Sequence, residues 1–455
     1  MTTPSRSNPS RRRFLGKLAT AALATGATPR LLSASEASRA RIMEARSYKS
    51  PNDRIQLAVI GAGGMGMADV STALDIPGAE LVAACDLYDG RLEAAREEHG
   101  QNLFTTRDYR EVLARDDVDA ILVATPDHWH ARISVDALRA GKAVYCEKPM
   151  VHSVQEGYDV VQAQEESGKT FQVGSQGMSS LGNEKAKELF EEGVIGELNY
   201  AEGFWARNDP VGAWQYAIPD DASEETVDWV RFLGDKPYHP FDPLRFFRWR
   251  NYRDYGTGVS GDLFVHLFSS LHFVTSSLGP TQVQAQGGLR YWKDGREVPD
   301  VLLGMFDYPP ASAHTPFNLS LRVNFVDGTS GSTFLRLVGN EGAMDVTWTE
   351  VILRRNKVSG PTDVFQQAKE DEMEETLAQR KQMLPPAESV WMAEGGYRGA
   401  HFDHLMNFAH GVRNGTPVTE DAVFGLRAAA PALACNDCYF QERILRWDPE
   451  EMRIR

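Results

Sequence analysis

The sequence predicts an α/β protein of two domains, in which a doubly wound parallel sheet is followed by a domain built on an antiparallel sheet. Three observations lead to this fold class. The 455 residues are enough for two domains of ordinary size. Apolar, β-branched runs alternate with helical stretches over residues 54–146, as in βαβ units. Later runs at 319–325 and 331–337 alternate apolar and polar residues, which is typical of an antiparallel sheet with one solvated face.

The composition excludes several classes of protein. Hydrophobic residues make up 42% of the chain and charged residues 24%, which is ordinary globular usage and excludes a disordered or collagen-like chain. Lys and Arg number 48 against 63 Asp and Glu, so the net charge of −15 would repel a phosphate backbone, and no nucleic-acid partner is expected. Four cysteines cannot support a disulfide scaffold of this length.

The N-terminus has the pattern of a twin-arginine export signal. Three arginines at 11–13 precede Phe14 and Leu15, and a mildly apolar, Ala-rich stretch follows at 18–27. That stretch is too short to span a bilayer, and a disordered basic tail is the alternative reading. We predict that residues 1–52 are signal and linker, that the twin-arginine translocase is a partner, and that the protein is periplasmic or otherwise exported. Since this route exports folded proteins, a bound cofactor is expected.

The first domain carries a dinucleotide-binding fingerprint. A strand at 54–60 runs directly into GAGGMG, whose spacing is G-x-G-x-x-G. Gly61 permits the tight turn, Gly63 lets the backbone approach a pyrophosphate, and Gly66 allows close packing of the following helix. Together with Met65 they are our predicted cofactor-binding loop, and a Gly-rich turn of another doubly wound domain is the alternative.

The acidic residue that follows the second strand predicts which dinucleotide binds. The strand at 80–85 ends at Asp86, 20 residues after Gly66. A carboxylate there accepts hydrogen bonds from an adenosine ribose and repels a 2′-phosphate, which favours NAD. Arg91 is near enough in sequence to keep NADP as an alternative.

Two further strands, at 120–124 and 143–146, flank a helical stretch at 131–140. Ligands of such sheets bind beyond the carboxyl ends of the strands, where the loops 125–130 and 147–149 emerge. Both loops are therefore predicted to face the cofactor, and their predicted cofactor-binding residues are Thr125, Pro126, His130, Glu147 and Lys148.

These motifs resemble the Gfo/Idh/MocA family, named after glucose-fructose oxidoreductase, inositol dehydrogenase and rhizopine catabolism proteins. The resemblance rests on the glycine loop, on T-P-x-x-x-H ending at His130, and above all on Glu147, Lys148 and Pro149. It continues through VIGEL at 194–198, GTGVSGD-x-x-x-H at 256–266 and the stretch 404–449. It implies an NAD(P)-binding Rossmann domain at 53–175. It also implies a substrate-binding and oligomerisation domain of α+β type at 176–455, with an open, mainly antiparallel sheet, and assembly as a homo-oligomer.

The resemblance also assigns catalytic roles to three residues. Asp262 and His266 are four apart and would share one face of a helix over 262–273, and spacing alone shows no more. The resemblance makes His266 the acid or base for a sugar hydroxyl, Asp262 its orienting or proton-relay partner, and Lys148 the cation that holds the same oxygen. This set fits the chemistry because a hydride leaves a carbinol carbon readily only as the hydroxyl proton is removed. The alternatives are a surface or N-cap pair and a simple salt bridge.

Two other motifs predict no chemistry. His128 and His130 could suggest a metal site, but imidazoles two apart on an extended loop diverge and no further ligand set is evident, so no metal is predicted. Cys435 and Cys438 form C-x-x-C in a helical stretch at 422–440 without a redox-motif context, so they are predicted to be packed in the helix.

The second domain bears on the substrate. Aromatic residues are dense over 204–255, and a core beneath an irregular insertion accounts for most of them. Some rings are expected to stack on a sugar, while nearby polar residues reach hydroxyls or a carboxylate: Arg207, Asn208, Asp209, Arg245, Arg248 and Arg250. The polar stretch 366–389, which contains Pro385 and Pro386, predicts an exposed helix and loop.

The sequence thus predicts an exported NAD(P)-dependent oxidoreductase acting on a secondary hydroxyl of a small carbohydrate, namely a sugar, polyol or glycoside. Free NAD is scarce outside the cytoplasm, so a tightly held, internally recycled cofactor is expected. One alternative is a redox-neutral glycoside hydrolase or lyase that uses transient oxidation. The other is a protein that binds nucleotide or sugar without turnover.

Overall fold

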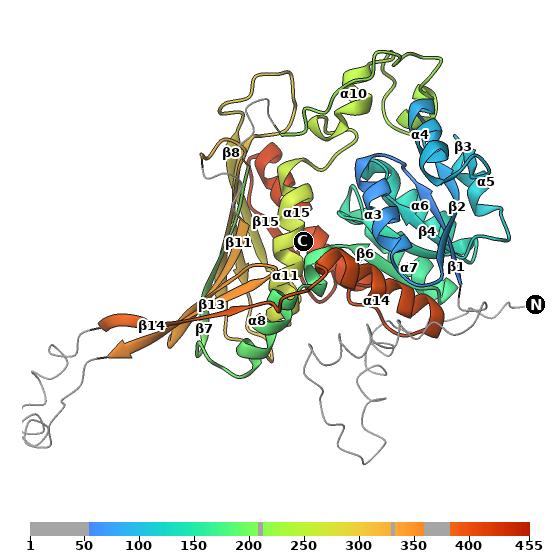
Figure 1. The fold of residues 1–455 in the computed structure, drawn as a ribbon. Coiled ribbons are helices and arrows are strands. Elements are labelled where there is room, and N and C mark those ends of the chain that lie inside the picture. The colour runs from blue at the N-terminus through green and yellow to red at the C-terminus, as the bar shows by residue number, and fades with distance from the viewer. Residues whose placement is uncertain (1–53, 208–212, 329–332, 359–382) are drawn as a thin grey trace, which may run out of the picture.

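The computed structural model describes residues 54–207, 213–328, 333–358 and 383–455, which form two sheets with their helices (Figure 1). The predicted signal and linker at 1–52 lie outside the described residues, as does most of the stretch 366–389. No helix in the described ranges is long and apolar enough to cross a membrane. A six-stranded parallel sheet and a ten-stranded, mainly antiparallel sheet are both present, so the predicted fold class is confirmed.

The first sheet has the strand order β3-β2-β1-β4-β5-β6, with every pair parallel. Its strands are β1 (Ile55–Ile60), β2 (Ala79–Cys85), β3 (Phe104–Thr106), β4 (Ala120–Val123), β5 (Ala143–Glu147) and β6 (Phe171–Gly174). Strands β4, β5 and β6 are buried at every residue because helices cover both faces of the sheet. This order is that of the doubly wound dinucleotide-binding fold.

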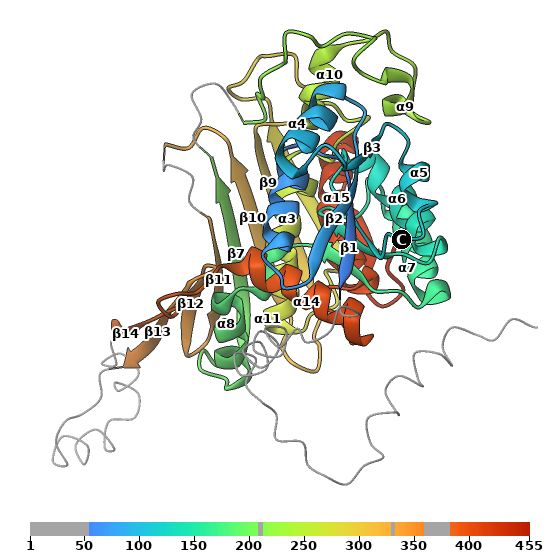
Figure 2. The same cartoon turned by 45° about the vertical axis from the view of Figure 1, so that its right-hand side comes forward.

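Helices from two distant parts of the chain cover the first sheet. The local ones are α3 (Gly64–Leu74), α4 (Asp89–His99), α5 (Tyr109–Leu113), α6 (Asp127–Arg139) and α7 (Val154–Ser167). Helix α14 (Ala400–Asn414) returns to lie against α3 and β1, and its Phe402, Leu405 and Met406 join the core of this sheet (Figures 1 and 2). The first sheet is therefore completed by a segment that lies far beyond residue 175.

The second sheet has the order β14-β13-β12-β11-β7-β10-β9-β8-β15-β16, and β7 with β10 is its parallel pair within the described strands. Its longer strands are β7 (Leu198–Ala206), β8 (Gln282–Gly288), β9 (Val301–Tyr308), β10 (Phe317–Asn324), β11 (Thr333–Gly339), β13 (Glu350–Val358) and β14 (Met383–Met392). The shorter ones are β12 (Gly342–Val346), β15 (Leu445–Asp448) and β16 (Arg453–Ile454). Side chains of β9 alternate between buried and exposed, so one face packs inward and the other carries exposed residues such as Leu303 and Met305.

The inward face of the second sheet is covered by helices that separate it from the first domain. They are α8 (Leu181–Glu191), α11 (Val265–Thr275) and α15 (Ala422–Gln441), which Figure 1 shows between the two sheets. A short 3₁₀ helix η3 (Gln176–Ser179) joins β6 to α8. Cys435 and Cys438 are buried, free thiols of α15, so the predicted packed-helix placement is confirmed.

An irregular segment reaches from the second sheet over the first domain. It contains α9 (Trp229–Leu233), α10 (Pro243–Phe247) and η4 (Trp249–Asn251) and lies above α4 in both views (Figures 1 and 2). Tyr88 of the first domain packs in one core with Val227, Trp229 and Phe247 of this segment. The predicted core beneath an irregular insertion is therefore confirmed for most of the aromatic residues.

Three predicted elements differ from the structure. The helix expected at 262–273 begins instead as a π-helical turn, η5 (Ser260–Phe264), before α11. The helix expected from residue 131 begins at Asp127, so His128 and His130 lie in its first two turns and not on an extended loop. Pro385 and Pro386 lie in β14, not in a helix or loop, since an edge strand tolerates residues that cannot donate a ladder hydrogen bond.

Candidate active site

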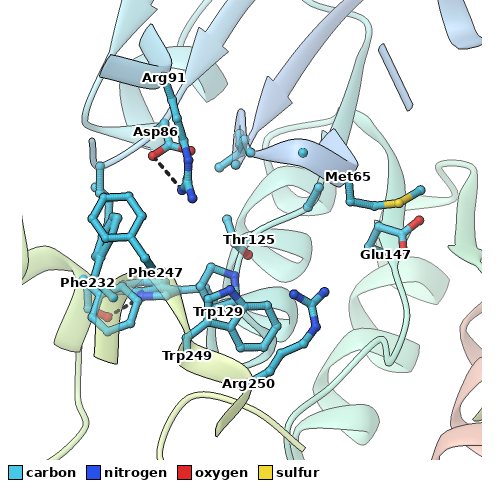
Figure 3. Close-up of a pocket in the computed structure, with 18 of the residues that line it drawn as sticks. Met65, Asp86, Arg91, Thr125, Trp129, Glu147, Phe232, Phe247, Trp249 and Arg250 are labelled. Atoms are coloured by element: carbon cyan, nitrogen blue, oxygen red, sulfur yellow. Dashed lines mark hydrogen bonds and ion pairs between the residues drawn. The ribbon is translucent and has the colours of Figure 1, made fainter. Parts of the chain in front are cut away.

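A cavity of about 670 Å³ opens between the first domain and the irregular segment of the second (Figure 3). One end is formed by the glycine loop and Asp86, and the other by Lys148, Arg250 and Asp262. Both predicted sites, for cofactor and for substrate, therefore border one continuous space.

The glycine loop fits the pyrophosphate of a dinucleotide. Gly61 has φ +96°, and a Cβ added to it would lie 2.6 Å from the Ala124 carbonyl carbon. A Cβ at Gly66 would lie 2.0 Å from the Gly61 oxygen, so neither position accepts a side chain without movement. Helix α3 begins here with no side-chain cap and no acidic residue in its first turn, which leaves backbone N–H groups for an anion. Gly63 and Met65 line the cavity beside them.

Asp86 lies at the end of β2 with its carboxylate bordering the cavity. Its Oδ1 accepts a hydrogen bond from the Tyr88 backbone at 3.0 Å, and Arg91 Nη1 lies 3.4 Å from it. The Arg91 guanidinium rests over the rings of Phe246 and Phe247, at 5.7 and 5.5 Å from their centroids. A carboxylate in this place fits the ribose hydroxyls of NAD, and the adjacent guanidinium keeps NADP as an alternative.

At the opposite end of the cavity, two cations share one buried carboxylate. Lys148 Nζ donates to the Asp262 Oδ1 and to the Asp262 carbonyl, both at 3.0 Å. Arg250 Nε lies 3.3 Å from the same Oδ1. Burial alone would raise the pKa of Asp262, but Lys148 and then Arg250 hold that pKa well below its usual range. Asp262 is therefore an anion that orients both cations.

His266 lies next to this pair, in the first turn of α11. Its ring stacks on Trp205, with centroids 4.9 Å apart and planes at 23°, and Trp348 meets it at 6.3 Å. Its Nδ1 is buried without a hydrogen-bond partner in the described part of the chain. Burial, and then the charge of Lys148, lower the pKa of His266 well below its usual value, so the ring is neutral at neutral pH.

The charges of Lys148 and Asp262 both act on His266, so the three predicted residues lie near one another, but Lys148 and Asp262 line the cavity whereas His266 is not among its lining residues. One predicted contact is not seen. No hydrogen bond joins Asp262 to His266 among the described residues, and the Asp262 side chain contacts Lys148 and Arg250. The two indole rings hold the imidazole by packing. The role of Asp262 as the orienting partner of His266 stays a prediction.

The two loops beyond β4 and β5 are joined by His130. Thr125, Pro126 and Glu147 line the cavity, whereas His130 lies behind it. The His130 nitrogens lie 2.7 Å from the Pro149 oxygen and 2.8 Å from the Thr125 oxygen. Burial opposes a charge here, but Cys146, Asp127 and the Pro149 carbonyl raise the pKa of His130 to about 10, so both nitrogens can donate. His130 therefore acts as a positioning residue that ties one loop to the other.

His128 and His130 do not pair as metal ligands. The His128 nitrogens face the carbonyl oxygens of Phe232, at 2.8 Å, and Tyr255, at 3.3 Å, so carbonyl groups engage both imidazoles. Among the described residues, no group of three or more His, Cys, Asp or Glu side chains could hold a metal ion.

A buried acidic pair, Asp69 and Glu147, was not predicted from the sequence. Glu147 accepts a hydrogen bond from Gln176 Nε2 at 2.6 Å and faces Asp69, which α3 places in the interior. Burial and then the charge of Glu147 raise the pKa of Asp69 well above its usual value. Asp69 could have been identified from its spacing. It follows Gly66 by one helical turn and adjoins Val70, so it falls on the buried face of α3.

The polar residues predicted to meet substrate divide into two groups. Arg207 and Arg250 line the cavity, together with Trp214, Tyr216 and Trp249. Arg245 is paired with Glu297, and Arg248 donates to the Tyr216 carbonyl. Both arginines therefore stabilise the irregular segment, and neither lines the cavity. Asn208 and Asp209 lie outside the described residues.

Three known proteins show what this chain is similar to. Inositol 2-dehydrogenase of Rubrobacter xylanophilus is 34% identical over 201 residues, 44% of this chain and 54% of the relative. A glycosyl hydrolase family 109 protein of Shewanella baltica is 31% identical over 160 residues, 33% of this chain and 34% of the relative. The solved structure of levoglucosan dehydrogenase with NADH and L-sorbose has a TM-score of 0.62 at 18% identity, covering 86% of this chain and 98% of the other, which shows a shared fold.

The chain spans about half the length of the first curated relatives that it matches. Residues 55–175 match the family model for oxidoreductases of the Gfo/Idh/MocA type with an NAD-binding Rossmann fold. This match covers the glycine loop, Asp86 and the loop at Lys148. The match identifies residues 55–175 as an NAD-binding Rossmann domain similar to that of these oxidoreductases.

Proposed function

We propose that this protein is an exported oxidoreductase that removes hydride from a secondary hydroxyl of a sugar, polyol or glycoside and keeps its NAD(P) tightly bound. The observation that carries the proposal is the single cavity that joins the glycine loop to Lys148 and Asp262. The names of two similar proteins, inositol 2-dehydrogenase and levoglucosan dehydrogenase, support a polyol or sugar substrate.

The chain's own residues can prepare a hydroxyl for oxidation. Bound NAD would supply the hydride acceptor. Lys148 has three N–H donors, and Asp262 accepts two of them, which leaves one for a substrate oxygen. Neutral His266 can take the hydroxyl proton, and the Lys148 charge stabilises the alkoxide that forms.

Two further parts of the proposal concern the whole protein. Residues 1–52 comprise a twin-arginine signal, recognised by the translocase, and its linker. Lysines in place of Arg11 and Arg12 would therefore leave the protein in the cytoplasm on cell fractionation. The exposed face of the ten-stranded sheet, with Leu303 and Met305, supports assembly as a homo-oligomer. A monomer in light scattering would contradict this part.

A redox-neutral reaction is the second candidate, because a relative named as a glycosyl hydrolase family 109 protein is 31% identical over 160 residues. Transient oxidation of a glycoside, elimination and re-reduction would use the same Lys148, Asp262 and His266. The cofactor would then end each cycle in the state in which it began.

The experiment that tests the proposal begins with purified protein that has lost its signal. After denaturation, the released nucleotide is identified by mass, and NAD(H) or NADP(H) near one per chain is expected. Native protein is then mixed with sugars, polyols and glycosides while absorbance near 340 nm is followed. Lasting reduction indicates a dehydrogenase, and release of the aglycone without lasting reduction indicates the second candidate. Bound nucleotide that no substrate reduces would indicate a binding protein without turnover and overturn the proposal.

A further inference from the structure

The charge of the cavity is opposite to the charge of the chain. The whole sequence carries a net charge of −15. The cavity is nevertheless lined by six cations and three carboxylates, namely Arg91, Arg107, Lys148, Arg207, Arg231 and Arg250 with Asp86, Glu147 and Asp262. Cations gathered in a concave site favour an anionic ligand.

At the nucleotide end, each arginine has a carboxylate of its own. The pairs are Arg91 with Asp86 at 3.4 Å, Arg107 with Asp89 at 2.5 Å, and Arg231 with Asp228 at 2.6 Å. The backbone N–H groups at the N-terminus of α3 would bind the pyrophosphate of the nucleotide. The cations at this end are thus largely neutralised by the protein.

At the substrate end, the cations outnumber the carboxylates among the residues that the structure describes. Asp262 is shared by Lys148 and Arg250. The Arg207 guanidinium lines the cavity and has no ion pair or hydrogen bond within the described residues. Glu147 also lines the cavity, where it faces Asp69 and accepts a hydrogen bond from Gln176. Asp127 accepts two hydrogen bonds from Thr257.

We propose that the substrate is a sugar acid, and that its carboxylate is bound by Arg207 and Arg250. This inference rests on the proposed function and names its substrate class. A guanidinium offers parallel N–H donors that match a carboxylate, and Arg250 has donors left beyond its contact with Asp262. Figure 3 shows Arg250 reaching into the cavity beside Trp249, at the end away from Asp86. The neighbouring rings of Trp249, Trp214 and Tyr216 supply faces for the sugar.

Binding is the first test, because it does not require turnover. Hexuronic and aldonic acids and their neutral parents, such as glucuronate with glucose and galacturonate with galactose, are titrated into the full-length NAD-loaded protein by calorimetry. At least one acid is expected to bind about tenfold or more tightly than its neutral parent, as hydrogen bonds to a charged group typically provide. Arg207→Gln should reduce that ratio at least threefold. Arg322→Gln changes an arginine on β10 that lies over Phe204, and should leave the ratio unchanged.

The outcomes separate this inference from the proposed function. Acids that bind tightly but never reduce the nucleotide would support the carboxylate site at Arg207 and Arg250, but would overturn the proposed function and the role of the acid as substrate. If neutral sugars are oxidised and no acid binds more tightly than its neutral parent, the proposed function stands and the inference of a sugar acid is overturned. If glucose 6-phosphate bound more tightly than every acid, the inference of a carboxylate would be wrong, and the two arginines would be assigned to a phosphate group of the substrate. Acids that displace NAD would show that these cations serve the cofactor, and would overturn the inference.

Discussion

The two ends of the cavity are built in different ways. The nucleotide end is shaped by the backbone, since Gly61 and Gly66 leave no room for a side chain and the amides of α3 face the space. The other end is formed by side chains from three separate segments, with Lys148 after β5, Arg250 in η4 and Asp262 in η5. We therefore expect substitutions at the first end to change nucleotide affinity, and substitutions at the second end to change turnover.

The largest effect is expected for Lys148→Met. The substitution removes the donor and the charge that would stabilise an alkoxide, while Arg250 remains to pair with Asp262. Loss of such a group costs roughly 10³-fold in kcat. Steady-state kinetics, together with the nucleotide content of the purified variant, measure both properties, and bound nucleotide should be retained.

Lys185→Met is the matched control, because Lys185 pairs with Glu188 away from the cavity. It should keep wild-type kcat. If Lys148→Met kept more than a tenth of wild-type kcat, the proposed role of Lys148 would be wrong. If it lost its nucleotide instead, the functional division between the two ends would fail.

The next effect is expected for Gly66→Ala, which tests the backbone end. The new Cβ would lie 2.0 Å from the Gly61 oxygen, so the loop must move away from its helix. Overpacking of this kind costs about 1–3 kcal/mol, and we expect NAD affinity to fall roughly tenfold or more. Gly64→Ala is the control for apo-protein stability, since a Cβ there meets no atom within 4 Å. Equal melting temperatures for the two apo variants would contradict the argument.

The same contrast explains how much could be predicted from the sequence. The glycine loop and Asp86 were predictable because their residue types and spacing fall within one βαβ unit of the sequence. The close approach of Gly61 to Ala124, which follows β4, was not. The assignment of Lys148, Asp262 and His266 needed a family resemblance, since spacing cannot show that β5 and η5 meet. The contact of Arg250 with Asp262 was not predicted, because it depends on how η4 packs on η5. The stacking of Trp205 on His266 was not predicted either, because it depends on how β7 packs on α11.

The edge strand β14 and the π-helical turn η5 also could not be predicted from the pattern of apolar and polar residues. Two prolines within a polar stretch predict a loop, but β14 pairs on one side only, so Pro385 and Pro386 need not donate to a neighbour. The turn at 260–264 has the apolar spacing of an ordinary helix in the sequence, but it is π-helical, and Ser260 donates a hydrogen bond to the Ala432 carbonyl of α15.

A smaller effect is expected for Asp86→Ala, which tests the nucleotide choice. The change removes an acceptor for the ribose and frees Arg91 for a 2′-phosphate. The ratio of NADP to NAD affinity should rise about tenfold, measured by fluorescence titration of apo-protein. Glu93→Gln removes one carboxylate at an exposed position of α4, the helix that carries Arg91, and should leave this ratio unchanged. An unchanged ratio for Asp86→Ala would show that Asp86 does not select the cofactor.

The smallest effect is expected for moderate acid. An ordinary histidine has a pKa of about 6.5, so catalysis that needs its neutral form falls off near that pH. Burial lowers the pKa of His266 well below this value, so its neutral form persists as the pH falls through 6.5. We therefore expect kcat/KM at pH 6 to stay within about twofold of its value at pH 7.5, and to fall only at lower pH.

Trp205→Leu sharpens this last prediction, because the indole ring covers one face of the imidazole. Removing the ring admits water, reduces the burial that lowers the pKa of His266, and should move the acid limb of kcat/KM toward pH 6.5. A wild-type limb already centred near pH 6.5 would mean that His266 is well solvated or that another group takes the proton. His266→Gln decides between these two readings: a limb that persists in this variant belongs to another residue, and the side-chain end of the cavity would then need a different proton acceptor.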